Sequence, residues 1–96
     1  MNDPLSLPER FDSASVQAFT ATVQDLRAQP LILDGSRVAS AGTLAVQALI
    51  ATRRQWQEDA VAYRLTAPSD ALLEACAILG VSPDAIGAQA DGGPSA

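Results

Sequence analysis

The sequence predicts a small α/β domain with a mostly parallel or mixed β-sheet and helices packed mainly on one of its faces. Three stretches have apolar residues at the three- and four-residue spacing of an α-helix, and short stretches typical of β-strands alternate with them. Strands that alternate with helices require crossover connections, which join parallel strands. The length of 96 residues suits one domain, and we expect residues 1–87 to form it.

In the first third of the chain we expect an edge strand, a helix and a central strand. Residues 5–7 alternate apolar and polar between two prolines, which is typical of an edge strand. A helix should begin near residue 14, where Asp12 or Ser13 can accept hydrogen bonds from its first N–H groups. Its apolar stripe is Val16, Phe19, Val23 and Leu26. Residues 31–33 are continuously apolar, which predicts a strand buried on both faces in the middle of the sheet.

In the remainder we expect two helices, another strand and a tail. After a loop of small residues, a second helix should span residues 44–59, and residues 61–65 alternate as a half-buried strand does. A third helix follows, and Gly80 suits its left-handed C-cap. The stripe of this third helix is Leu72, Leu73, Cys76 and Leu79. A last helical turn should lie within residues 81–86, and residues 88–96, without an apolar side chain larger than alanine, should be a disordered tail.

Composition excludes several classes of function. The chain has no histidine, which removes the commonest general base and most zinc sites. Its net charge of −5 would repel nucleic acid. We therefore expect no enzymatic activity, no metal, no cofactor and no nucleic-acid partner. A single cysteine, the absence of an apolar run of ~20 residues and an N-terminus unlike a signal peptide predict a cytoplasmic protein that does not insert into a membrane.

The candidate binding residues follow the expected central strand. Asp34 stands at the carboxyl end of that strand, where open α/β sheets bind partners or ligands, although it is also suited to forming a simple turn with Gly35. The loop that follows, with its small and polar residues, leads into the second helix. Its glycine spacing fits no nucleotide-binding motif, and there is no lysine.

The segment of residues 31–56 resembles the STAS domain, the fold of anti-sigma factor antagonists and of regulatory tails of anion transporters. That family has a strand followed by the motif V-x-x-[IVM]-D-[ST]-[SA]-G-[LI], which opens the second helix. In this chain the defined positions of the motif, from its Val to its Gly, are Val38, Ala41, Gly42, Thr43, Leu44 and Ala45. The order of elements agrees with the family from Leu5 to Leu79.

The resemblance implies a changed regulatory loop. In phosphorylatable antagonists the second Ser or Thr of the motif receives phosphate, but Leu44 has no hydroxyl. Thr43 keeps a hydroxyl one position earlier, as in the MlaB-like partners of a lipid-transport ATPase, where a Thr in this place contacts the partner. Thr43 is therefore a possible phosphoacceptor, because a helix N-terminus favours negative charge, or else a residue that caps the helix or contacts the partner.

The resemblance implies a non-enzymatic regulatory module that binds another protein in bacterial signalling. The expected partner is a signalling kinase, an anti-sigma factor or a chemotaxis component, because the chain also resembles small stand-alone STAS proteins encoded beside chemotaxis genes. Two alternatives are a small MlaB-like subunit of a phospholipid-transport ABC ATPase and a small-ligand sensor. The expected partner-binding residues are Asp34, Ser36, Ser40, Gly42, Thr43 and Leu44.

Overall fold

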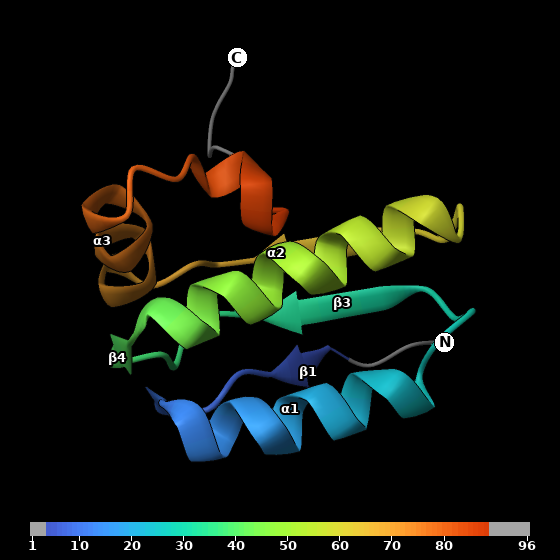
Figure 1. Cartoon of the computed structure of the whole chain (residues 1–96), viewed down its shortest axis with the longest axis horizontal. Helices are drawn as coiled ribbons and strands as arrows, with labels where there is room; N and C mark the ends of the chain where they lie inside the picture. Colours follow the sequence, from blue (N-terminus) through green and yellow to red (C-terminus); the bar gives the residue numbers. More distant parts are fainter. Residues whose placement is uncertain (1–3, 89–96) are drawn as a thin grey trace.

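The computed structural model describes residues 4–88. In chain order its elements are β1 (Leu5–Ser6), β2 (Arg10–Phe11), α1 (Ser13–Asp25), β3 (Leu31–Asp34), β4 (Ser40–Ala41), α2 (Thr43–Glu58), β5 (Tyr63–Thr66), α3 (Asp70–Ile78) and the 3-10 helix η1 (Pro83–Ile86). In Figure 1, α1 and α2 run side by side along the strands, and α3 lies with β4 at the end of the molecule where α2 begins.

Every strand pairing in the described part of the chain is parallel. The main sheet has the order β1-β3-β5, in which Leu33 pairs with Leu5 on one side and Leu65 on the other. The second, smaller sheet joins β2 to β4. The predicted α/β class and the central position of residues 31–33 are therefore confirmed.

The helices cover one face of the main sheet. Leu31, Leu33 and Leu65 are buried on that face, whereas Ile32 is only half-buried and its neighbour Arg64 is exposed on the other. The prediction that residues 31–33 are buried on both faces was therefore wrong. A continuous apolar run does not show on which side the helices pack, and here no helix of residues 4–88 covers the outer face.

A helix cap, an aromatic pair and a hydrogen bond between residues far apart in the chain hold the N-terminal elements and the end of α2 in place. The Asp12 carboxylate accepts a hydrogen bond from Ser15 N at 3.0 Å and so caps α1. The rings of Phe11 and Phe19 meet edge to face with centroids 5.4 Å apart. Trp56, in the last turn of α2, is buried and donates its indole N–H to the Gln29 carbonyl at 2.7 Å. The ring pair holds α1 against β2, and the Trp56 hydrogen bond holds the end of α2 against the segment that follows α1.

The start of α3 is tied to the loop before β4. Ser69 Oγ accepts from Leu72 N and donates to the Val38 carbonyl at 2.6 Å. As the stripe predicted, Leu72 and Cys76 are buried. The prediction was wrong for Leu79, which is 38% exposed, because α3 ends at Ile78 and the chain turns away at Gly80, whose φ is +69°.

Two further features of the fold differ from the sequence expectations. The loop after Gly35 contains β4, which lies beside β2. The N–H groups of Ala39 and Ser40 donate to the Glu9 carbonyl. Ala88, expected in the tail, is 1% exposed and bridges to Leu65, so the packed chain extends one residue past the expected boundary. The expected disorder of residues 89–96 lies outside the described residues.

Candidate functional site

Helix α2 begins without a capping side chain. Its N-cap is Gly42, and a Cβ atom built there would meet no other atom within 4 Å. The first N–H groups of a helix have no intrahelical acceptor. In α1 and α3, Asp12 and Ser69 satisfy one of these groups, whereas the beginning of α2 is left to solvent or to a binding partner.

Two open hollows meet at this uncapped helix start. The larger, of about 470 Å³, is lined by Phe11, Asp12, Ser13, Ser40, Ala41, Gly42, Thr43, Leu44 and Ala45. The smaller, of about 120 Å³, is lined by Ala41, Gly42, Thr43, Ala75, Ile78 and Leu79. Glycine, alanine and threonine form the shared lining, so side chains of another molecule can approach the backbone closely here.

Exposed apolar side chains gather around the two hollows. Among residues 4–88 the large hydrophobic residues that are exposed are Leu44 at 55%, Ile78 at 78% and Leu79 at 38%, and each lines one of the hollows. We call this surface the α2 N-terminal face. It consists of Ala41, Gly42, Thr43, Leu44, Ile78 and Leu79. Exposed apolar side chains that gather in one place are typical of an interaction site.

One ionised carboxylate lines the larger hollow. The pKa of Asp12 lies below its ordinary value of 3.8, chiefly because its carboxylate accepts the hydrogen bond from the Ser15 backbone. Asp12 therefore stays charged at neutral pH. Within residues 4–88, no three His, Cys, Asp or Glu side chains are grouped so that they could hold a metal ion.

The structure brings four of the six expected binding residues together. Ser40, Gly42, Thr43 and Leu44 all line the larger hollow. The other two lie apart from both hollows: Asp34 Oδ1 accepts from Ser36 N at 2.9 Å, which closes the turn after β3. The same backbone hydrogen bond lowers the pKa of Asp34. This geometry favours the turn-forming alternative for Asp34.

Sequence reasoning missed the contribution of α3. Ile78 and Leu79 come from its C-terminal end, which lies beside β4 and the start of α2. One feature of the sequence could have indicated this contribution: Ile78 stands off the apolar stripe of its helix, where an apolar side chain is expected to be exposed. The structure shows that it is exposed. Its proximity to Thr43 depends on the packing of α3.

The comparisons with known proteins agree with this fold. A family model described as "Mlab, STAS domain" matches residues 2–83. This chain belongs to the STAS domain family. No curated protein and no solved structure matches it significantly.

Membership of this family indicates the general role of the domain. STAS domains are small regulatory modules that typically bind other proteins and carry no enzymatic activity. Within the part of the chain that the structure describes, no helix is both long and apolar enough to cross a bilayer.

Proposed function

We propose that this STAS domain is a non-enzymatic regulatory module that binds a partner protein through its α2 N-terminal face. The observation that carries the proposal is the convergence of Leu44, Ile78 and Leu79 on the two hollows beside Gly42. Burial of these three side chains supplies affinity, since apolar groups at the centre of an interface dominate its energy. The uncapped N–H groups of α2 add donors for a carbonyl or carboxylate of the partner.

Thr43 has two roles in this proposal: it contacts the partner, and its hydroxyl is a site for phosphorylation. Its side chain is exposed where the two hollows meet, so a docked partner touches it. The same exposure makes its hydroxyl accessible to a kinase. Phosphate there would be tolerated at the helix N-terminus but would place a large charge among apolar side chains, and so would oppose docking. Mass spectrometry of protein from the native host detects this modification directly.

Two classes of partner are candidates. The first is a bacterial signalling protein in the cytoplasm: a kinase, an anti-sigma factor or a chemotaxis component. The second is a phospholipid-transport ABC ATPase, and the name Mlab in the description of the matching family favours it. A ligand sensor gains no support, because Asp34 and Ser36 do not line the hollow that Thr43 lines.

Affinity purification from the native host tests the proposal. Wild-type protein should capture one dominant partner, whose identity decides between the two classes. Leu44→Glu and Thr43→Arg should each reduce the captured amount about ten-fold or more, because each places a charge within an apolar interface. Gln57→Glu, at the exposed far end of α2, is the matched control and should capture as much as the wild type.

Circular dichroism of each variant separates lost binding from lost folding. If folded Leu44→Glu and Thr43→Arg both capture the partner at the wild-type level, the α2 N-terminal face is not the docking surface and the proposal fails.

A further inference from the structure

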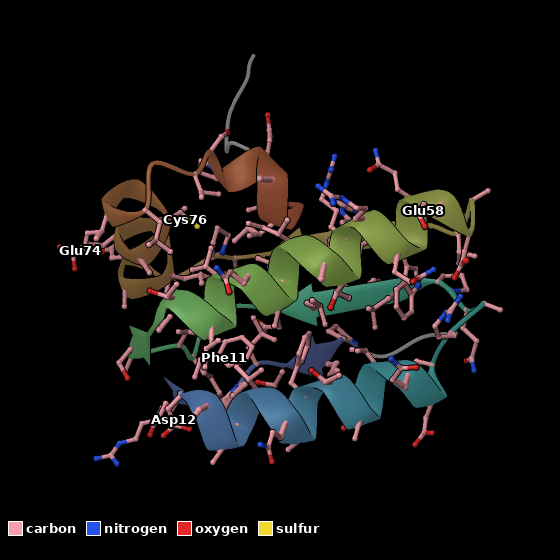
Figure 2. The ribbon with its side chains drawn as sticks, viewed as in Figure 1. Phe11, Asp12, Glu58, Glu74 and Cys76 are labelled. Carbon is pink, nitrogen blue, oxygen red and sulfur yellow. The ribbon has the colours of Figure 1, made fainter. Side chains whose placement is uncertain are left out.

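Acidic side chains lie on both sides of the α2 N-terminal face. Asp12, at the start of α1, lines the larger hollow, and Glu74 is exposed one turn before Ile78 on α3. Figure 2 shows Asp12 and Glu74 on opposite sides of the start of α2, at the same end of the molecule. The apolar centre of the face is therefore flanked by negative charge.

Among the described residues, no basic side chain lines either hollow. Helix α3 contains two acidic residues and no basic one. Arg10, next to Phe11 in β2, is exposed and lines neither hollow. The positive charge of Arg37 contributes to lowering the pKa of Asp34, in the turn after β3.

We propose that the α2 N-terminal face binds an amphipathic helix of the partner, with apolar side chains in its centre and lysine or arginine on both flanks. This inference rests on the proposed function. The apolar side chains would lie against Leu44, Ile78 and Leu79, while basic side chains reach Asp12 on one side and Glu74 on the other. One helix presents these groups together when its apolar residues recur at three- and four-residue spacing.

The charge of the whole molecule acts in the same direction. With a net charge of −5 and no lysine, the chain attracts basic partners at long range and raises their association rate. The same flanks disfavour an anionic lipid surface as the occupant, because its headgroups would face Asp12 and Glu74.

A titration of the full-length ¹⁵N-labelled protein with two synthetic helical peptides tests the inference. Both peptides carry the same leucine stripe, one with lysine flanks and the other with glutamate flanks. The lysine peptide should shift the amide signals of Thr43, Leu44, Ile78 and Leu79 saturably, and more weakly as salt is raised. The glutamate peptide should bind about ten-fold more weakly or not at all. Equal binding of the two peptides, or shifts centred elsewhere on the molecule, would overturn the inference.

Matched charge variants separate the flanks from the overall charge. Asp12→Asn combined with Glu74→Gln should weaken binding of the lysine peptide about five-fold, and asparagine still caps α1. Asp25→Asn combined with Glu58→Gln removes two exposed carboxylates elsewhere and should change binding less than about two-fold. Equal losses in the two double variants contradict the inference.

Capture of the native partner distinguishes this inference from the proposed function. Suppose that Leu44→Glu abolishes capture while the Asp12→Asn and Glu74→Gln double variant captures as much as the wild type. The α2 N-terminal face is then the docking surface, as proposed, but the inference that the partner has basic flanks is wrong.

Discussion

Three alanines hold a backbone conformation that favours glycine. Ala28, Ala60 and Ala67 have φ angles of +70°, +57° and +49°, in the left-handed region. This conformation costs a residue with a Cβ atom about 1 kcal/mol. Ala60 directly follows the C-cap of α2, the position where helices commonly have glycine. The end of α2 is therefore set by the contacts that follow it, since the residue itself does not favour the turn.

Ala60→Gly should raise the free energy of unfolding by about 0.5 kcal/mol, because the relieved strain exceeds the greater flexibility that glycine gives to the unfolded chain. The midpoint of urea denaturation measures this change. Ala21→Gly, exposed in the middle of α1, is the control and should lower the free energy of unfolding by about 1 kcal/mol. A loss of stability in Ala60→Gly would contradict the argument.

At the scale of elements, α2 stands out from the other helices described. Asp12, Ser69 and Ser82 each accept a backbone N–H at the start of α1, α3 and η1, whereas Gly42 offers α2 no acceptor. The longest helix thus begins with its N–H groups open beside the exposed Leu44. If a partner uses these groups, capping them should raise stability and lower affinity together.

Gly42→Ser should raise the free energy of unfolding by about 0.3 kcal/mol, because the new hydroxyl caps α2 and nothing lies within 4 Å of the added Cβ. It should also reduce partner capture several-fold, since the hydroxyl occupies the N–H groups that the partner needs. Urea denaturation and affinity purification measure the two effects. Gly42→Ala, which adds volume without an acceptor, should lower stability and leave capture near the wild-type level. Undiminished capture by Gly42→Ser would show that the partner does not use these N–H groups.

At the scale of the whole molecule, the response to pH follows from a few groups. Hydrogen bonds from the backbone lower the pKa of Asp12 and Asp34 below 3.8. Burial raises the pKa of Tyr63 above 10 and that of Cys76 above 9, and the Tyr63 hydroxyl donates to the Ile86 carbonyl at 2.8 Å. There is no histidine, the side chain that ordinarily titrates near neutrality.

Stability should therefore be nearly constant between about pH 5 and pH 8 and fall on either side. On the acid side the unfolded chain takes up protons first, because its aspartates have the higher pKa, so stability falls below about pH 4. On the alkaline side the unfolded chain releases protons first, so stability falls as pH rises past the ordinary pKa values of cysteine and tyrosine. Urea midpoints across this range measure the profile, and Tyr63→Phe should reduce the alkaline loss. A marked change between pH 5 and pH 8 would contradict this account.

Much of the fold could be predicted from local pattern. The three helices, a cap at Asp12 or Ser13, the left-handed Gly80 and the central parallel strand were all expected, because each depends on neighbouring residues or on a simple period. Strands β2 and β4 could not be predicted, since neither stands in an alternating apolar and polar stretch as β1 does, and each exists only where its partner lies beside it. The buried position of Ala88 depends in the same way on β5.

The features of the candidate site also separate into those that follow from local sequence and those that depend on packing. The small-residue loop and the absence of a hydroxyl at Leu44 are properties of consecutive residues, so the amino-acid sequence establishes them. That no side chain caps the start of α2 is seen only in the folded chain. The packing of the elements brings Ile78 and Leu79 beside Leu44 around that helix start, and it leaves Asp34 and Ser36 outside the two hollows. A binding surface depends on which elements pack together, and the packing of α3 beside β4 comes from contacts between residues far apart in the chain.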